Sequence, residues 1–592
     1  MIWSDFFGYC SNSTTDLQAM SREIELRLQI PGLVTRVSQR IVAAGSGWSF
    51  LQKDWDAEVI VLFSGELLEK EAMCQEMSIP LNTPDPDVVL NTFLKKGDLC
   101  FENLKGVYSA AILEGSKALV YRDPIGARGL FYHIDNKGLT FSNRLPFVMA
   151  NPLADEGLDE GSFHEYLRFL DICGPRTIFK NVFHLEPGSL LVYENGRCNI
   201  RELDLAKDQI FSAPHGIDEA ADNLERLLRE KIQERLDPVK TGIFLSGGID
   251  SGIVAAIASD IAADKIEAFT VGFENKAFDE MHIAGQVAKH LNIKHRPLYF
   301  RQKDYFRIFD KVVSEMDQPY ADPSSLPTFL KFEYCRDKAG AFLDGTGADG
   351  IMGDLPPRQK IFAARYAKYL PGTLRKMMVR LADKNKFVSN YRQIFDFDDP
   401  AELFIRWKGY KKEEIQQLCN RPVSFAETTF FKEFDKNKKL SPLALYGALL
   451  KVMSDDRIHQ STRPYELNLR FPFWDTQIKA YVRLFDESYK YDFENMKPKK
   501  VLRMIFGRYV PSRIWDFPKH GFNFPLAAFL HAYMDQIVHR YLTTPGELCE
   551  GMIDKKLIVK QVKRFNKGDN SVIFKLWLLI VFQAWSESRK KW

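Results

Sequence analysis

Short apolar runs bounded by turn residues dominate the first part of the chain, up to about residue 205. Such runs are typical of β-strands, and three of them cover residues 58–63, 108–113 and 189–193. The last run ends at Asn195-Gly196, a pair that favours the tight turn of a β-hairpin. We therefore expect a sheet-rich domain over residues 1–205.

The pattern then changes to strands that alternate with helices. Its predicted elements are a helix at 218–235, a strand at 242–245, a helix at 253–263, a strand at 266–271 and a helix at 281–291. This alternation predicts a parallel α/β sheet, and ligands of such sheets bind beyond the carboxyl ends of the strands.

Beyond residue 353 the pattern is mainly helical. The most apolar late stretch, residues 572–585, is too short to cross a bilayer and is expected to be a buried helix. A chain of 592 residues is too long for a single core. We therefore place a second domain at residues 206–592.

Composition narrows the class of partner. A net charge of +3 gives no reason to expect nucleic acid, and no segment suggests a membrane partner. The eight cysteines show neither metal-ligand spacing nor a disulfide framework, and no signal peptide is recognised, so a cytoplasmic location is expected. The short basic clusters at 497–500 and 589–591 are expected to be solvated surface.

The most informative segment for function follows the predicted strand at 242–245. There Leu245 precedes Ser246-Gly247-Gly248-Ile249-Asp250-Ser251, called here the first glycine loop, and a predicted helix comes next. Glycines let backbone amides approach an anion, and the helix N-terminus attracts it. Asp250 adds a carboxylate that could share Mg²⁺ with phosphates. The Walker pattern is absent, and the alternative interpretation is an ordinary turn between a strand and a helix.

A second glycine loop, Gly345-Thr346-Gly347-Ala348-Asp349, has the same arrangement of an apolar run, small residues and an acid. Asp250 and Asp349 could hold one Mg²⁺ on a pyrophosphate between the two loops. The alternative interpretation makes Asp349 a helix cap.

Further motifs make the chain resemble the asparagine synthetase family, which includes β-lactam synthetases and lasso-peptide macrolactam cyclases. These motifs are Phe278-Asp279-Glu280 with Ala284, Asp317-Gln318-Pro319-Tyr320-Ala321-Asp322-Pro323-Ser324-Ser325, Arg470-Phe471-Pro472-Phe473-Trp474-Asp475, and Lys519-His520-Gly521-Phe522 with Pro525. The resemblance covers nearly the whole chain. It implies a parallel α/β PP-loop ATP pyrophosphatase domain of the HUP-like class, preceded by a degenerate Ntn-type β-sandwich similar to class II glutamine amidotransferases.

The resemblance also implies a reaction. ATP and a carboxylate would give an acyl-adenylate and pyrophosphate, and an amine would then displace AMP, so ATP and Mg²⁺ are the expected cofactors. The implied site residues are Leu245, Ser246, Gly247, Gly248 and Ser251 around the nucleotide phosphates, Asp250 and Asp349 on Mg²⁺, Val271 and Gly345 at the adenosine, and Lys519 as a catalytic cation. Without its motif, Lys519 would be taken for a surface lysine.

The first domain resembles the family's glutamine-hydrolysing domain. The matching segments are Ser64-Gly65-Glu66 in the place of N-G-E, Asp85-Pro86-Asp87, 104–110, 122–126 and 174–179. Its expected nucleophile is a cysteine directly after Met1, but Ile2 stands there and Ser4 matches the cysteine's place. Glutamine hydrolysis is therefore not expected unless the chain is processed, and the domain is expected to be structural or to help bind substrate.

The synthetase half also departs from the family, on the side of the amine acceptor. Thr346 replaces an acid between the two glycines, Asn468 stands where many members have Glu, and Phe517 replaces an Arg. Thr346 remains a candidate catalytic position, although a hydroxyl is no base at neutral pH. The candidates for a general base are Asp344, His459, Glu466 and His520.

These observations favour an ATP-dependent amide ligase that does not use glutamine and that forms a lactam or macrolactam. Its partners would be a carboxylate and an amine, in a peptide or small molecule, with a precursor peptide and its protease as further partners of a cyclase. Asparagine synthetase-like amidation with ammonia or another amine is the second hypothesis. An inactive nucleotide-binding scaffold is the alternative from another class, and a tRNA-modifying enzyme is disfavoured by the cysteine pattern and charge.

Overall fold

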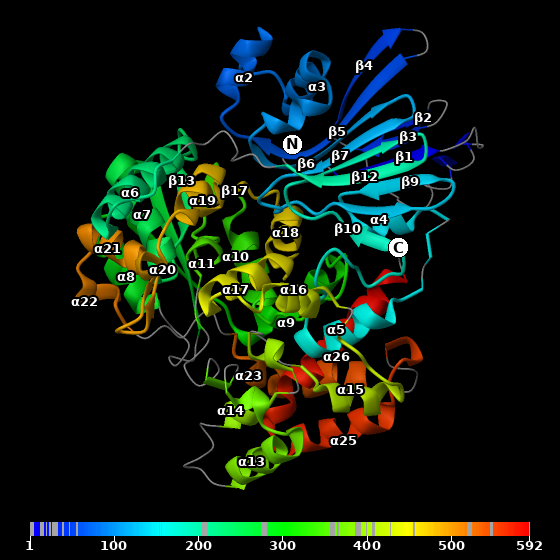
Figure 1. Ribbon diagram of the computed structural model, residues 1–592, viewed down its shortest axis with the longest axis vertical. Coiled ribbons are helices and arrows are strands. Elements are labelled where there is room, and N and C mark those ends of the chain that lie inside the picture. The colour runs from blue at the N-terminus through cyan, green and yellow to red at the C-terminus, as the bar shows by residue number, and fades with distance from the viewer. Residues whose placement is uncertain are drawn as a thin grey trace.

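The computed structural model describes most of the chain. The described residues are 5–11, 17–18, 21–22, 25, 34–37, 41–45, 48–54, 57–152, 154–155, 157–203, 211–273, 281–353, 355, 362–363, 366–384, 392–397, 399–404, 409–426, 428–453, 456–517, 524–544 and 549–590. Two antiparallel sheets lie at the N-terminal end, a parallel sheet with its helices lies beside them, and a helical part follows (Figure 1).

The N-terminal sheets have the strand orders β10-β8-β9-β1-β3-β2 and β12-β11-β7-β6-β5-β4. Their bounds are β1 Phe6–Ser11, β2 Val34–Val37, β3 Ile41–Gly45, β4 Trp48–Asp54, β5 Ala57–Leu67, β6 Gly106–Glu114, β7 Lys117–Arg122, β8 Phe131–Ile134, β9 Gly138–Ser142, β10 Val182–His184, β11 Ser189–Glu194 and β12 Arg197–Glu202. The three strands predicted here are confirmed, and Glu194 pairs with Arg197 across the predicted Asn195-Gly196 turn.

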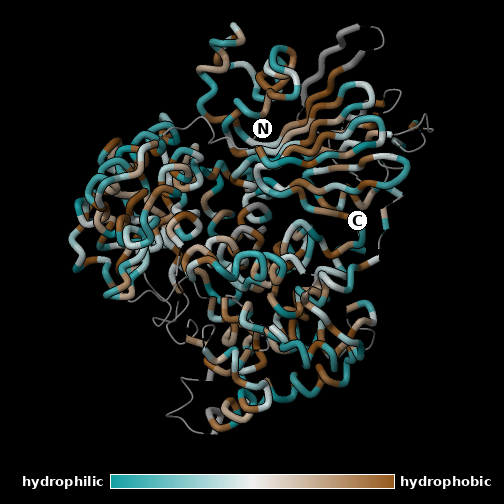
Figure 2. The backbone as a smooth tube through the Cα atoms, in the orientation of Figure 1, coloured by the Kyte–Doolittle hydropathy of each residue, from teal (hydrophilic) through white to brown (hydrophobic). Residues whose placement is uncertain are grey.

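Alternate side chains of β5 enter two different cores, because successive residues of a strand point to opposite faces. Ile60 and Leu62 pack between the two sheets. Val59, Val61 and Phe63 pack under α2 (Lys70–Met77) and α3 (Asp85–Lys96). Residues 59–63 of β5 are accordingly apolar at every position, and hydrophobic colouring runs along several neighbouring strands of these sheets (Figure 2). This is the β-sandwich that the resemblance implied, with helices over one sheet.

The third, five-stranded sheet is parallel throughout its order β15-β14-β13-β16-β17, as predicted. Its strands are β13 Thr241–Phe244, β14 Ile266–Gly272, β15 Lys294–Tyr299, β16 Ala341–Leu343 and β17 Leu469–Arg470. Its helices are α6 Ile217–Glu234, α7 Ile249–Ala262, α8 Met281–His290, α9 Gln302–Ser314, α10 Ser325–Cys335 and α11 Ala348–Met352. Helix α7 begins four residues before its predicted start, directly after the first glycine loop's Gly248.

Both faces of this sheet are covered. Ile243 packs with α6, α7 and α8 on one face, whereas Phe244 packs with α9 and α10 on the other. Because β13 lies between β14 and β16, the strand order changes direction there. The crevice at such a point is where open α/β sheets bind ligands.

The remaining elements are one pair of short strands and a series of helices. They are β18 Tyr491–Asp492, β19 Lys497–Pro498, α4 Leu145–Met149, α5 Glu160–Phe169, α13 Gly372–Lys384, α14 Arg392–Phe395, α15 Lys412–Cys419, α16 Thr429–Asn437, α17 Pro442–Val452, α18 Asp456–Thr462, α19 Thr476–Arg483, α20 Glu487–Lys490, α21 Lys500–Tyr509, α22 Ser512–Trp515, α23 Leu526–Ala532, α24 Arg540–Leu542, α25 Lys555–Asn566 and α26 Ile573–Arg589. The late apolar stretch is the buried helix α26, as predicted.

Side chains from the two sides of the predicted domain boundary contact each other. The predicted boundary at 205/206 lies outside the described residues, between β12 and α6. Helix α5 precedes that boundary, yet Tyr166 on α5 donates a 2.6 Å hydrogen bond to the carbonyl oxygen of Leu578 on α26. Phe163 of α5 and Phe582 of α26 are also in edge-to-face contact. Within the described part of the chain, no helix is both long and apolar enough to span a bilayer.

Candidate active site

The first glycine loop joins β13 to α7 at the carboxyl edge of the parallel sheet. Two hydroxyls fix its shape: the amide of Ser246 donates to Ser251 Oγ at 3.0 Å, and the two serine Oγ atoms lie 3.0 Å apart. Gly247 has φ of 79°, a left-handed conformation that favours glycine. The N-cap of α7 is Gly248, whose missing side chain leaves the first helical turn open to an anion.

A buried lysine joins the two carboxylates that the sequence placed on Mg²⁺. Lys499 Nζ lies 2.6 Å from Asp250 Oδ2 and 2.5 Å from Asp349 Oδ1. Burial opposes the charged ammonium, but Asp250 and Asp349 outweigh burial and raise the pKa of Lys499 above its usual range. Asp250 and Asp349, which are 99 residues apart in sequence, therefore converge on one cation.

Lys499 corrects an expectation from the sequence. The cluster 497–500 was expected to be solvated surface, but Lys499 is only 6% exposed. Sequence reasoning missed it because three lysines within four residues are typical of a surface. The signal that could have found it is its position directly before the apolar face of α21, where Val501 and Leu502 are buried.

The second glycine loop packs directly on the first. A Cβ atom added to Gly345 would lie 2.6 Å from the amide nitrogen of Ser251, so only glycine allows this approach. Gly347 has φ of 106° and lies against Trp474. Asp349 is in the first turn of α11 and carries the ion pair with Lys499, while the N-cap position belongs to Gly347.

Thr346 is bonded to another residue of the same turn. Its hydroxyl donates to Asp344 Oδ1 at 2.5 Å, and its amide donates to the same oxygen at 2.8 Å. The second oxygen of Asp344 lies 4.0 Å from the ammonium of Lys331. Where the family has an acid, this chain therefore has the Thr346 hydroxyl, which orients the carboxylate of Asp344.

The residues predicted at the adenosine lie on both sides of the first glycine loop. Val271 is near the end of β14, and its neighbour Thr270 donates a 2.7 Å hydrogen bond to the carbonyl oxygen of Leu245. His295 in turn lies 2.9 Å from the Thr270 hydroxyl, and burial lowers the pKa of His295. These contacts fix the end of β14 against the loop.

Several other predicted residues lie either outside the described part of the chain or at its exposed surface. Lys519, His520, the segment 278–280, Ile2 and Ser4 lie outside the described residues, as does the His459 side chain. Glu466 is exposed, with φ of 49°, at the end of a short 3-10 helix. Phe517 is 53% exposed. Among the base candidates, Asp344 is the one that the described residues place beside the glycine loops.

Two motif residues of the synthetase half face the N-terminal domain. Asp317 accepts a 2.8 Å hydrogen bond from Nε of Arg144. Arg470 Nη2 lies 2.5 Å from Glu66 Oε1, and its Nε donates to the other oxygen at 3.2 Å. Sequence motifs alone did not reveal either contact. Both residues hold the two domains together.

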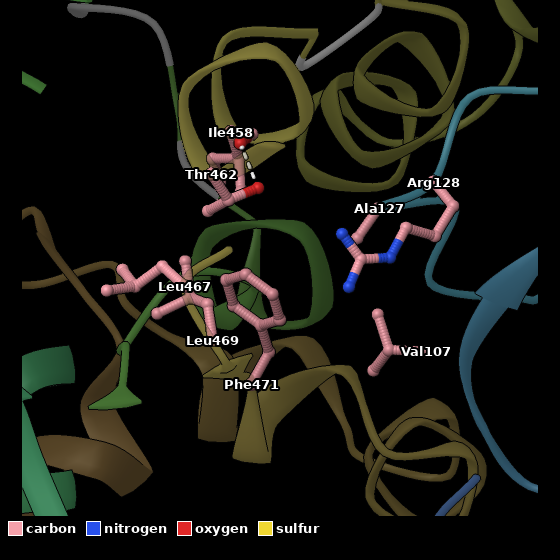
Figure 3. A pocket seen from close by; sticks show the side chains of 8 residues that line it. All are labelled: Val107, Ala127, Arg128, Ile458, Thr462, Leu467, Leu469 and Phe471. Atoms are coloured by element: carbon pink, nitrogen blue, oxygen red, sulfur yellow. Dashed lines mark hydrogen bonds between the residues drawn. The ribbon is translucent and has the colours of Figure 1, made fainter. Parts of the chain in front are cut away.

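A small cavity lies beside the Glu66–Arg470 contact. It is lined by Val107, Ala127 and Arg128 of the N-terminal domain and by Ile458, Thr462, Leu467, Leu469 and Phe471 of the synthetase half (Figure 3). The guanidinium of Arg128 reaches toward these apolar side chains, and burial lowers its pKa against the opposing effect of Asp123 and Glu66. The domain interface is therefore mostly apolar at this point.

The described residues fit ATP with Mg²⁺. The donor set is two carboxylates from separate loops that already share one cation, and an open helix N-terminus lies beside them. No group of three or more potential metal ligands occurs among the described residues. Such a pair suits Mg²⁺, which commonly takes one or two carboxylates together with substrate phosphates.

Two family profiles match the chain. The asparagine synthase family profile matches residues 223–587, and the glutamine amidotransferase domain profile matches residues 51–203. A putative glutamine-hydrolysing asparagine synthetase 2 of Methanocaldococcus jannaschii is 24% identical over 426 residues, 70% of this chain and 82% of that one.

Two further relatives align over more of the chain. A glutamine-hydrolysing asparagine synthetase 1 of Bacillus subtilis is 24% identical over 554 residues, 89% of this chain and 85% of that one. A Penicillium rubens protein named amidase chyE is 24% identical over 591 residues, 87% of this chain and 84% of that one. With the family profile matching well over half of its length, this chain belongs to the asparagine synthase family of ATP-dependent carbon–nitrogen ligases.

Proposed function

We propose that the protein adenylates a carboxylate with ATP and joins it to an amine without hydrolysing glutamine, in a lactam- or macrolactam-forming reaction. The observation that carries the adenylation step is the convergence of Asp250 and Asp349 on one buried cation beside the open N-terminus of α7. That arrangement suits a triphosphate with its metal ion.

The residues of this chain would act mainly by positioning and by charge. The amides of the first glycine loop would receive the pyrophosphate, and Asp250 and Asp349 would hold Mg²⁺. When bound, Mg²⁺ would neutralise charge on the leaving pyrophosphate. Lys499 supplies a fixed positive charge at the same place, and Lys519 is proposed to do so at the reacting phosphate.

On the acceptor side, Asp344 is the proposed proton acceptor for the attacking amine. Its carboxylate lies beside the first glycine loop, because Gly345 packs on that loop. The Thr346 hydroxyl orients one of its oxygens. The carboxylate of Asp344 would then take the role of the acid that other family members have at the position of Thr346.

The independence from glutamine is supported by the contacts of Glu66. This residue sits where glutamine-hydrolysing domains have the acid of N-G-E, and here both of its oxygens are engaged by Arg470. An amine held within the substrate, as in lactam formation, would need no ammonia from this domain. Amidation by free ammonia is the second candidate, because relatives named asparagine synthetases align over most of the chain.

The test is ATP–pyrophosphate exchange with defined carboxylates, together with a glutaminase assay. We expect exchange with a peptide or amino acid that carries its own amine, no exchange with Asp250→Ala, and no glutamate released from glutamine. Asparagine formed from aspartate and ammonia would support the second candidate. Failure of every carboxylate to support exchange would support an inactive nucleotide-binding scaffold instead.

A further inference from the structure

An ion pair joins the N-terminal domain to a strand beside the nucleotide site. Glu66, near the end of β5, binds Arg470 of β17 through both carboxylate oxygens, and the two side chains are 24% and 13% exposed. With its amide oriented to donate, Asn468 adds a 3.1 Å bond to the same carboxylate. A two-pronged contact of this kind fixes the position of a guanidinium better than a single bond.

The backbone of Arg470 supports the second glycine loop. Strand β17 is only two residues long and pairs with β16 at the edge of the parallel sheet. The carbonyl oxygen of Arg470 accepts a 3.1 Å hydrogen bond from the amide of Asp344, and that of Asn468 accepts one of 2.8 Å from Phe342. Because so short an edge strand makes few ladder bonds, its place depends on how its side chains are anchored.

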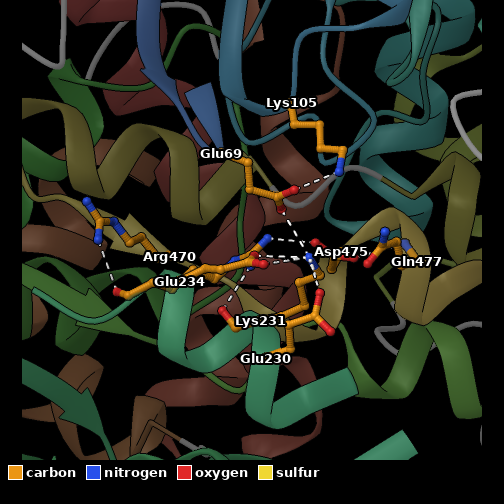
Figure 4. Close-up of polar contacts among 9 residues, drawn as sticks. Glu69, Lys105, Glu230, Lys231, Glu234, Arg470, Asp475 and Gln477 are labelled. Atoms are coloured by element: carbon orange, nitrogen blue, oxygen red, sulfur yellow. Dashed lines mark hydrogen bonds and ion pairs between the residues drawn. The ribbon is translucent and has the colours of Figure 1, made fainter. Parts of the chain in front are cut away.

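The other end of the same motif is anchored as well. Glu69 of the N-terminal domain lies 3.3 Å from Lys231 on α6 (Figure 4). Arg235, one turn later, pairs with Asp475 at 2.8 Å. Lys231 is almost fully buried. Burial opposes the charge on Glu69, but Lys105 and Lys231 lower its pKa to about 2. The segment 470–475 is thus held at its start by Glu66 and at its end by Arg235 of α6, the helix whose Lys231 pairs with Glu69.

Between these two ends the segment touches the second glycine loop. Trp474 packs so closely on Gly347 that a Cβ atom there would lie 2.4 Å from the indole ring. The loop that carries Asp349 therefore rests on Trp474 from the side and on the Arg470 backbone at its start. Movement of 470–475 would move the carboxylate that Lys499 and the predicted metal share.

We propose that Glu66 is a positioning residue for the nucleotide site, and that the glutamine amidotransferase-like domain serves here as a clamp that holds residues 470–475 under the second glycine loop. The acid that matches a glutamine-hydrolysis motif has become a support for the synthetase half. This inference rests on the proposed function for the identity of the ligand, Mg²⁺–ATP, but its geometric part is independent of that ligand.

The experiment measures Mg²⁺–ATP affinity of the full chain by calorimetry for Glu66→Ala and Glu66→Gln. We expect about tenfold weaker binding for Glu66→Ala, within the range of couplings carried through packed elements, and a smaller loss for Glu66→Gln. The matched control is Glu76→Ala, which removes an acid of α2 that pairs with Lys96 at 2.9 Å inside the same domain. Binding by the control should match that of the wild type.

A rescue separates positioning from general loss of structure. Glu66→Arg alone should weaken Mg²⁺–ATP binding. The double exchange of charges, Glu66→Arg with Arg470→Glu, should recover at least half of that change, measured as the logarithm of the dissociation constant. Hydrogen exchange supplies a second measurement that needs no nucleotide. The amides of Phe342 and Asp344 should exchange faster in Glu66→Ala than in the wild type or Glu76→Ala, because they donate to the β17 backbone.

The outcomes distinguish this inference from the proposed function. If the wild type binds no Mg²⁺–ATP while the two amides still respond to Glu66→Ala, the clamp stands and the nucleotide assignment fails. If the wild type binds Mg²⁺–ATP and Glu66→Ala binds it equally well with unchanged exchange, the clamp is wrong.

Discussion

Replacing Lys499 by methionine tests the centre of the candidate site. Methionine keeps the length and apolar character of the stem but removes the charge between Asp250 and Asp349. The Asp250 side chain is 15% exposed and depends on this ion pair, whereas that of Asp349 is 62% exposed and remains solvated. The main cost of Lys499→Met is therefore a largely buried carboxylate that loses its nearest counter-charge.

The magnitude follows from the distances. Two unit charges 2.6 Å apart attract by about 6 kcal/mol at an effective dielectric constant of 20. Part of this is offset because the buried ammonium no longer has to be desolvated. Removing one partner of a buried pair costs roughly 3–5 kcal/mol. With Asp349 open to water, we expect the low end of that range, about 3 kcal/mol, for Lys499→Met without ligand.

The assay is paired urea unfolding of wild type and Lys499→Met, with and without Mg²⁺. The two carboxylates repel each other once the ammonium is gone, so Mg²⁺ should stabilise the variant more than the wild type. Lys497→Met is the control in the same cluster, because its 2.7 Å pair with Asp516 is exposed and should contribute less than about 1 kcal/mol. Equal stability of the two variants, with the same response to Mg²⁺, would refute the reasoning.

Three further predictions concern packing and buried charge. Burial raises the pKa of Glu165 from 4.5 to about 7. The contribution of Glu165 to the free energy of unfolding is therefore most favourable below pH 4.5, where the carboxyl is protonated in both states, and is lost as pH rises toward 7. Glu165→Gln should therefore gain about 3 kcal/mol over the wild type across that window, and a pH-independent difference in urea unfolding would contradict this. Gly345→Ala should weaken Mg²⁺–ATP binding roughly tenfold by overpacking the first glycine loop, while Gly350→Ala, with nothing within 4 Å of its added Cβ, should not; calorimetry decides. Arg168→Met should cost roughly 3–5 kcal/mol by stranding Glu402, and adding Glu402→Met should recover most of it in scanning calorimetry.

The parallel sheet and the glycine loops could be predicted because their signals are local. A strand, a turn and a helix follow one another within about twenty residues, and periodicity reports each of them directly. The start of α7 was placed late, because the polar first turn with Asp250 and Ser251 hides the helical period. The loops themselves are recognisable since only glycine permits their conformation and their approach to each other.

The contacts that complete the site could not be predicted in the same way. Lys499 is 249 residues from Asp250, and Arg470 is 404 residues from Glu66. A lysine in a charged run and a glutamate at the end of a strand each have an ordinary solvated interpretation, and nothing within their own segments decides against it. These groups are buried because segments distant in sequence pack against each other. The hydrophobic pattern of a segment shows that one of its faces is buried, but not which other segment covers that face.

The packing explains how the proposed change of amine acceptor would leave the activation chemistry intact. Asp250, Asp349 and Lys499 lie on or beside α7, α11 and α21, and apolar residues of all three helices share one core that contains Ile253, Met352 and Val501. Their relative positions are therefore fixed by a common interior, and a change in any one helix would disturb the other two. Thr346 and Asn468, in contrast, lie on a turn and beside a two-residue edge strand that meets the N-terminal domain. Substitutions at these two positions alter polar contacts without disturbing the core. Such positions are therefore where a member of the family can acquire a new amine acceptor.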